Sequence, residues 1–320
     1  MASSGGDAKR AMGWLCAALL VLGAVSSGCT QDGDSSVTDA QPGDVLDGGG
    51  QACEGGQRTV MLMHKISFGR EVAPGVSVGA DLDGVTSDTQ DASGCFQADF
   101  VSEDGQEGID NQFARILPGL EAVGGEAIED IIKGAISSGE LLLMFQMEHL
   151  DRQSQDECVD VTVLQGKGQP EIGTDDLIEV NQTFDPDFSA PMAKVQGASI
   201  EDGKLLAGPV EFSLPIFVFG FDLVFNIRRA VLQAQWQRDG TMKGFISGSI
   251  SVTELLEIVE GIDGGGQITE LLEVVLAPSA DLFPDEEGIC SELSITLVFE
   301  AIPAFFYEDA LPELDAFQTP

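Results

Sequence analysis

The stretch SIEDGKLLAGPVEFSLPIFVFGFDLVFNIRRAVLQAQWQRDGTMKG, residues 199–244, decides the fold. An Asp-Gly pair lies between β-type runs at 202–203 and again at 239–240, and this dipeptide satisfies the positive φ angles of a type I′ hairpin turn. Between the two turns, apolar side chains alternate with polar ones. The alternation indicates one long strand, or two strands joined at Gly220 or near Arg228. The stretch therefore predicts antiparallel β-structure.

Alternation of the same kind recurs in both directions along the chain. It predicts core strands at 60–68, 141–149, 158–164 and 293–299. In the first of these, Val60, Leu62, His64, Ile66 and Phe68 share one predicted face.

Helices are fewer, and they come in two pairs. Apolar residues at helical spacing predict a first pair within 110–139, with Asp110 as a helix N-cap. The near copies VTELLEIVE (252–260) and ITELLEVVL (268–276) predict a second pair, in which Ser251 and Glu254 have capping-box spacing. We predict a β-rich α+β fold, with an antiparallel sheet or sandwich and two short helical pairs in a single domain, 53–303. An acidic tail follows at 304–320.

The charge is strongly unbalanced, with 54 acids against 15 bases and a formal net charge of −39. Phosphate backbones and anionic lipid headgroups repel such a chain, so nucleic acid is excluded as a direct partner. The same potential concentrates cations. A heavily solvated surface explains the acidity without any ligand.

The N-terminus has the organisation of an export signal. Lys9 and Arg10 precede an apolar run at 13–25, which is far shorter than the roughly 20 residues that span a bilayer. The run ends at VSSGC, which resembles the lipobox of bacterial lipoproteins and would make 1–28 a signal peptide. Cleavage after Ser26, at a small-x-small site, is the alternative.

The lipobox resemblance carries its own expectations. It implies that Cys29 is acylated and anchors the protein in a membrane of the bacterial cell envelope. Thr30 stands where an Asp would favour the inner membrane, so the resemblance implies the outer membrane or cell surface. Residues 29–52 are acidic and rich in Gly, Ser and Thr, and we expect a disordered linker.

The number of cysteines agrees with an anchored, exported protein. Cys16 leaves with the signal peptide, and Cys29 takes the lipid. Four cysteines then remain, which suits two disulfides in an oxidising compartment. Three connectivities are open, and we favour Cys53–Cys95 with Cys158–Cys290.

Acidic, Gly-rich loops make calcium the first candidate ligand, because hard cations bind several oxygen ligands from flexible loops. The spacing fails the EF-hand pattern, since Val85 stands at a ligand position and no Glu closes the loop. Acidic turns plus a helix cap explain the same residues without a metal. The candidate ligands are Asp81, Asp83, Asp104, Asp110 and Asn111.

Only two histidines occur, His64 and His149, and both are predicted on apolar strand faces. A convergent pair would suit a metal-assisted hydrolase. No HExxH, nucleophile elbow, P-loop or dinucleotide fingerprint accompanies them, so packed core histidines are the simpler interpretation.

Three functions follow from the sequence. The leading hypothesis is a lipid-anchored envelope lipoprotein whose folded domain is a non-catalytic binding or structural module, with a protein, glycan or cation as partner. The second is a carrier for an apolar ligand, with a cavity lined by Phe217, Phe219, Phe221 and Phe225. The third is the hydrolase.

Overall fold

The computed structural model describes residues 45–47, 53–121, 126–174, 176–218, 221–263, 266–307 and Ala310, and at a few of these positions the backbone alone. The chain divides into two units, Met1–Asp39 and Ala40–Pro320. All described residues belong to the second unit. The predicted signal peptide and Cys29 therefore lie outside the described residues.

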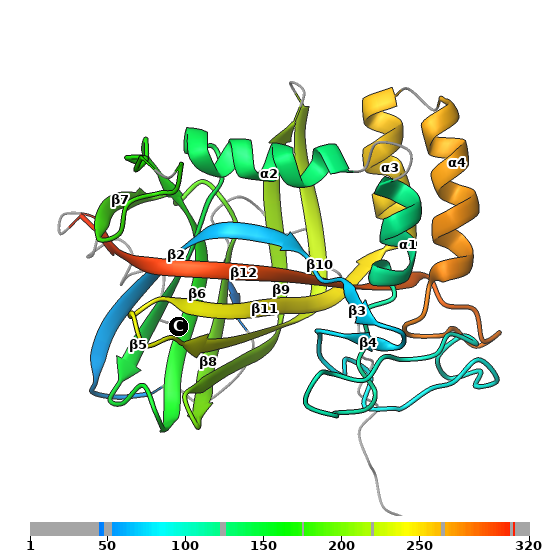
Figure 1. Ribbon diagram of the computed structural model, residues 1–320, viewed down its shortest axis with the longest axis horizontal. Helices are drawn as coiled ribbons and strands as arrows, with labels where there is room; N and C mark the ends of the chain where they lie inside the picture. The colour runs from blue at the N-terminus through cyan, green and yellow to red at the C-terminus, as the bar shows by residue number, and fades with distance from the viewer. Residues whose placement is uncertain are drawn as a thin grey trace, which may run out of the picture. The chain divides into compact units, whose positions relative to one another are not determined.

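Eight antiparallel strands form a sheet that closes on itself (Figure 1). Each strand pairs with the next one of the eight along the chain, and the last pairs with the first. The β-rich α+β class and the antiparallel sheet are thus confirmed, and the sheet is a single closed one instead of a sandwich. The strands are β2 (Gln57–Phe68), β5 (Leu142–Leu150), β6 (Asp156–Lys167), β8 (Met192–Glu201), β9 (Lys204–Val218), β10 (Phe221–Trp236), β11 (Met242–Ser251) and β12 (Glu292–Phe306).

Short strands are added at the margins of this sheet. β1 (Val45–Asp47) pairs in parallel with β8, so the linker predicted to be disordered contributes a strand. β7 (Gln182–Pro186) pairs with β6 and with the end of β12. β3 (Glu71–Ala73) and β4 (Val76–Ser77) form a separate two-stranded ribbon. β12 itself runs to Phe306, beyond the predicted start of the tail.

Both predicted helical pairs are present. They are α1 (Phe113–Leu120) and α2 (Glu126–Ser138), then α3 (Val252–Asp263) and α4 (Gln267–Leu276), with a 3-10 turn, η2 (Ala277–Ser279), after α4. α3 and α4 lie side by side, and α3 contacts β10 and β11 (Figure 1). Among the described residues, no helix combines the length and apolarity needed to cross a membrane.

The two helix caps predicted from sequence have different outcomes. The hydroxyl of Ser251 accepts a hydrogen bond from the Glu254 backbone N–H, as the capping-box spacing predicts. Asp110 does not cap α1: the N-cap is Gln112, which makes no side-chain capping bond. The Asp110 carboxylate is instead turned to the Leu82 backbone N–H, because a short β-bridge joins Asp110 to Ala80.

The two Asp-Gly turns lie where the sequence predicts them, between β8 and β9 and between β10 and β11. The run between them is two strands joined at 219–220, with a register irregularity after Ile227. Of the four candidate cavity-lining phenylalanines, Phe225 is half-buried against the core. Phe219, and the side chains of Phe217 and Phe221, lie outside the described residues.

Large apolar side chains fill the core of the sheet. The Phe145 and Phe299 rings meet edge to face with centroids 5.8 Å apart. In β2, Ile66 pairs with Phe299 and Met63 with Ala301, so Met63 and Ile66 share a face. The prediction that one face carries Val60 through Phe68 is therefore wrong, because a bulge at His64 reverses the alternation partway along the strand.

Two disulfides form, as the count of cysteines predicts, but the favoured pairing is wrong. The bonds join Cys53 to Cys158 and Cys95 to Cys290. Cys53 precedes β2 and Cys158 lies in β6, and only β5 separates these strands in the sheet. Cys95 and Cys290 belong to two loops that fold together although they are 195 residues apart in sequence.

Candidate functional site

Three carboxylates gather in the loop region, which we define as residues 69–112 together with 277–291. One oxygen each from Asp81, Asp83 and Asp110 lies within 4.8 Å of the others. Asp110 is buried, Asp83 is half-buried and Asp81 is exposed, so the cluster opens from the protein interior to solvent. We call these three residues the acidic group.

Backbone turns position each member of the acidic group. Asp81 accepts a hydrogen bond from the Gly84 N–H at 2.6 Å, and Asp83 accepts one from the Val85 N–H at 2.8 Å. These local bonds to following N–H groups are the usual turn chemistry of Asp. Asp110 comes from a separate part of the loop region and reaches the Leu82 N–H at 2.6 Å.

Two further carboxylates lie near the acidic group. Asp281 is buried and accepts hydrogen bonds from the Ser294 hydroxyl and N–H. Asp99 accepts one from the Ser87 N–H. Both raise the pKa of Asp110 through charge repulsion.

Burial dominates the protonation of this cluster. Desolvation, reinforced by Asp83, Asp281 and Asp99, raises the pKa of Asp110 to about 9 despite the Leu82 N–H bond. Desolvation raises the pKa of Asp281 to about 7 and that of Asp99 to about 6. It also raises the pKa of Asp83. The fold thus holds carboxyl groups together where ionising all of them is costly.

Arg115 is a base that interacts electrostatically with two carboxylates of this cluster, Asp281 and Asp99. Its guanidinium donates hydrogen bonds to the carbonyls of Ala98 and Asp99 and to the Gln112 side chain, and it stacks on the Phe100 ring at 3.9 Å. Burial lowers the pKa of Arg115, while Asp281 and Asp99 raise it. Among the ion pairs between described residues, none includes Asp81, Asp83 or Asp110.

This arrangement suits a hard divalent cation. Calcium takes six to eight oxygen ligands at about 2.3–2.6 Å, so two oxygens on one ion lie at most about 5 Å apart. The three oxygens of the acidic group satisfy that limit. A bound cation would favour the ionised carboxylates, and so oppose the desolvation and the mutual repulsion that raise the pKa values of Asp110, Asp281 and Asp99.

The sequence predicted all three members of the acidic group, together with two residues that lie elsewhere. Asp104 is exposed in a turn, hydrogen-bonded to the Ser102 hydroxyl, and its Oδ2 lies 3.8 Å from Lys204 Nζ. Asn111 is buried and donates to the Ser77 hydroxyl and the Val78 carbonyl. Asp99 and Asp281 were missed, because no local spacing links them to the loops at 81 and 110.

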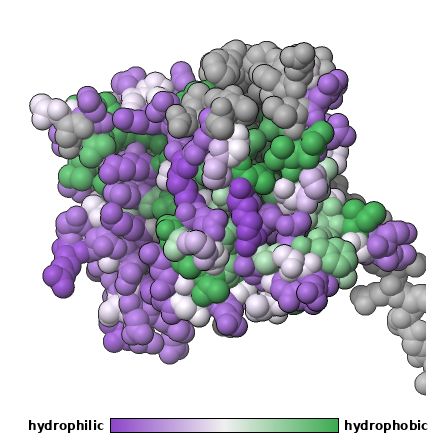
Figure 2. All heavy atoms as spheres, turned by 45° about the vertical axis from the view of Figure 1, so that its right-hand side comes forward, coloured by the Kyte–Doolittle hydropathy of each residue, from purple (hydrophilic) through white to green (hydrophobic). Residues whose placement is uncertain are grey.

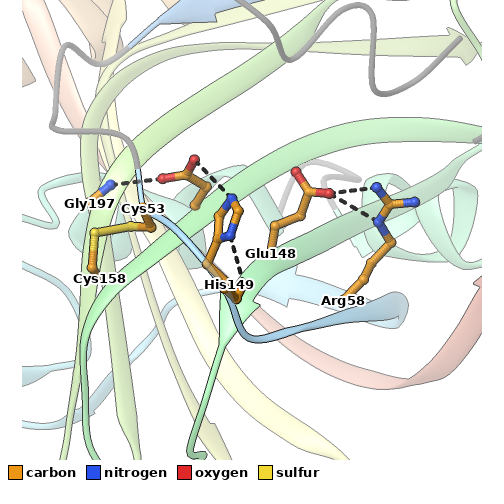
Figure 3. Close-up of polar contacts among 8 residues, drawn as sticks. Cys53, Arg58, Glu148, His149, Cys158 and Gly197 are labelled. Carbon is orange, nitrogen blue, oxygen red and sulfur yellow. Dashed lines mark hydrogen bonds and ion pairs between the residues drawn. A yellow bond between two sulfur atoms is a disulfide. The ribbon is translucent and has the colours of Figure 1, made fainter. Parts of the chain in front are cut away.

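His149 belongs to a second polar cluster, at the end of β5 (Figure 3). Its Nδ1 lies 2.8 Å from the Gly55 carbonyl, and its Nε2 lies 3.9 Å from Asp160 Oδ2. The other oxygen of Asp160 accepts a hydrogen bond from the Gly197 N–H. The Cys53–Cys158 disulfide lies in the same cluster (Figure 3).

The two histidines do not converge. Gln57 pairs with Leu150 and Thr59 with Met147, so His149 lies opposite the start of β2. His64 lies about six residues further along β2, which corresponds to roughly 20 Å at the rise of a β-strand. A metal held jointly by both imidazoles is ruled out by this register, and so is the hydrolase that would need it.

The face of the molecule drawn in Figure 2 is mostly hydrophilic, with apolar patches between the hydrophilic areas. A shallow groove of about 440 Å³ lies between β3 and α1, floored by Ala114 and Leu117 and walled by Val72. Arg70, at its end, is paired with Glu121 and Glu129. The groove is separate from the acidic group and offers no convergent set of reactive side chains.

Comparisons with protein-family models, curated proteins and solved structures return no match to this chain.

Proposed function

We propose that the chain is an exported lipoprotein, anchored in the bacterial outer membrane at Cys29, whose folded unit is a non-catalytic module that binds a divalent cation. Calcium is the cation we favour, and Asp81, Asp83 and Asp110 are its ligands. Asp99 and Asp281 adjust the charge around the site without belonging to the acidic group.

One observation carries the cation proposal: carboxylates from two separate parts of the loop region meet within 4.8 Å. Acidic turns alone do not require Asp110 to join Asp81 and Asp83, because their hydrogen bonds are made to backbone groups. The raised pKa of Asp110 supports the proposal. Burial destabilises the ionised form of this carboxyl group, and a bound cation would stabilise it. Calcium is favoured over magnesium because flexible loops suit its looser coordination.

The test is thermal unfolding and calorimetry of the full chain with and without calcium. We expect calcium to raise the melting temperature of the native protein, because a ligand that binds only the folded state stabilises it. Asp110→Asn and Asp83→Asn should lose that increase. Asp104→Asn is the matched control: it removes one charge from an exposed turn outside the acidic group and should keep the increase.

Two results would contradict the cation site. One is an equal calcium response in Asp104→Asn and Asp110→Asn, which would indicate screening of the net charge of −39 and no specific binding. The other is an equal response to sodium chloride at matched ionic strength. Magnesium at the same concentration separates calcium selectivity from general divalent binding.

The anchor is supported by the cysteine pairing. The two disulfides use four of the five cysteines that would follow signal-peptide cleavage, which leaves Cys29 for the lipid. Intact mass of membrane-extracted protein should give an N-terminus at Cys29 carrying acyl chains. Cys29→Ser should be released from the membrane fraction. An unmodified N-terminus at any other residue would overturn the anchor and leave the cation proposal standing.

A further inference from the structure

In the closed sheet, β8 and β9 pair with each other over only three residues each. We call the stretch beyond these residues, where the two strands part, the seam. Only Ser199–Glu201 of β8 pair with Lys204–Leu206 of β9. Beyond these residues, β8 pairs with β6 on one side, and β9 pairs with β10. Each strand therefore presents a backbone edge to the seam, and an open edge of this kind accepts an added strand.

Bulges in both strands explain why they part here. In β8, Val195 pairs with Val161 and Ala198 with Val159, so β8 carries one extra residue, and Gly197 adopts a φ of +69°. The Gly197 N–H donates to the carboxylate of Asp160, which lies in β6, the neighbour of β8 in the sheet (Figure 3). The register of β9 also shifts, between Ala207 and Val210, where Pro209 has no N–H to donate.

Strand β1 lies along this seam. Val45, Leu46 and Asp47 pair in parallel with Met192, Ala193 and Lys194, and β1 also contacts β9. Lys194 is the only base in β8 and is 5% exposed. Asp47 takes the register position of Lys194 in this pairing.

The start of the folded unit is fastened close to the seam. The Cys53–Cys158 disulfide and the His149–Gly55 hydrogen bond hold residues 53–55 against β5 and β6 (Figure 3). Five residues, 48–52, connect them to β1 and span at most about 20 Å. A strand on so short a connection has a high effective concentration at the seam.

We propose that the seam between β8 and β9 is a strand-acceptor site. Its ligand is an extended peptide in which two β-forming residues precede an acid, and residues 45–47 of this chain fill it. The site depends neither on the cation nor on the lipid anchor, so it extends beyond the proposed function.

The test is hydrogen–deuterium exchange of the full chain. Leu46→Pro removes a backbone N–H and blocks strand pairing, and we expect the seam-facing amides of Met192–Lys194 to exchange at least tenfold faster. Thr38→Pro, upstream in the linker, is the matched control and should leave these amides unchanged. Amides of β12 report that the sheet remains folded. A synthetic peptide covering residues 42–50, added to Leu46→Pro, should restore the protection, and a scrambled peptide should not.

A second variant tests the charge match without touching the backbone. Asp47→Lys is expected to raise exchange at Lys194, because two bases would then share one register position. Equal exchange in Leu46→Pro and Thr38→Pro would overturn the site. Protection restored equally by the scrambled peptide would overturn its selectivity for the sequence.

Discussion

Different interactions stabilise the closed sheet and the loop region. In the sheet, side chains such as Met61, Leu62 and Phe145 are at most 1% exposed, and burial of apolar surface stabilises them at any pH. In the loop region, Asp110 and Asp281 are almost as deeply buried, but they are carboxyl groups that burial disfavours once they ionise. The Cys95–Cys290 disulfide ties the two parts of the loop region together.

This contrast teaches which part of the molecule is free to respond to its surroundings. A packed apolar core has one stable arrangement and little dependence on ions. The loop region contains buried carboxyl groups whose pKa values are raised, so its stability depends on pH. For this reason the cation site is proposed in the loop region, while the sheet is its structural support.

The largest expected effect comes from the core. Phe145→Ala removes a ring that packs against Phe299, and we expect a loss of about 3–5 kcal/mol in the free energy of unfolding, measured with urea. Phe96→Ala is the control in the loop region: Phe96 is exposed and its loss should cost about 0.5 kcal/mol or less. A cost below about 1 kcal/mol for Phe145→Ala would indicate room inside the sheet and would favour the hypothesis of a carrier for an apolar ligand.

The contribution of Asp110 to the pH dependence of the cation-free protein should be nearly as large. The folded-state pKa of Asp110 is raised from 3.8 to about 9, so the folded protein keeps a proton that the unfolded chain loses above pH 4. The contribution of Asp110 to stability is then highest below about pH 4 and falls as pH rises towards 9. Asp281 adds to the loss up to about pH 7 and Asp99 up to about pH 6.

The magnitude follows from the pKa shift. Between pH 4 and pH 7, Asp110 alone should lower the free energy of unfolding by about 4 kcal/mol, at about 1.4 kcal/mol per pH unit. Urea unfolding in EDTA across this range measures the slope, and Asp110→Asn should reduce it by the share that belongs to Asp110. Calcium should reduce the loss, because it favours the ionised form. A slope that is equal in Asp110→Asn would place the titrating groups outside the acidic group.

Removing each disulfide in turn should distinguish the loop region from the sheet in its effect on calcium binding. Replacing Cys95 and Cys290 together by Ser is expected to cost about 2–4 kcal/mol and to weaken calcium binding, because the loops that carry the acidic group lose their cross-link. Replacing Cys53 and Cys158 should lower stability without changing calcium affinity. Calorimetry of both double variants measures this. Equal loss of affinity in the two would mean that the acidic group depends on the whole fold.

The smallest effect belongs to the sheet surface. Arg58 donates two hydrogen bonds to Glu148, and both side chains are partly exposed (Figure 3). Arg58→Ala should cost between 0 and about 1 kcal/mol, and less in high salt. A cost above about 2 kcal/mol, measured by urea unfolding, would show that the Arg58–Glu148 pair stabilises the sheet more than an exposed ion pair does.

Local patterns in the sequence predicted much of this molecule. The Asp-Gly turns, the alternating strands and the two helical pairs are each set by residues within a few positions of one another. The same is true of Asp81 and Asp83, whose turn identifies an acidic loop. Such features are predictable because backbone conformation and turn chemistry act over short separations.

Longer-range features were missed for one shared reason. Three features depend on which segments of the chain lie next to one another in the folded protein. They are the bulge at His64, the pairing of Cys95 with Cys290 and the approach of Asp281 to Asp110. No spacing in the chain encodes such a meeting, because it follows from packing of the whole sheet.

The sequence by itself determined the β-rich class, the strands and turns, the acidity and the number of disulfides, since each depends on composition or on neighbouring residues. Tertiary structure alone decided that the sheet closes, that residues 45–47 join it, which cysteines pair, and which carboxylates share one site. These last features require groups far apart in the chain to be buried together, and only the folded core brings them into contact.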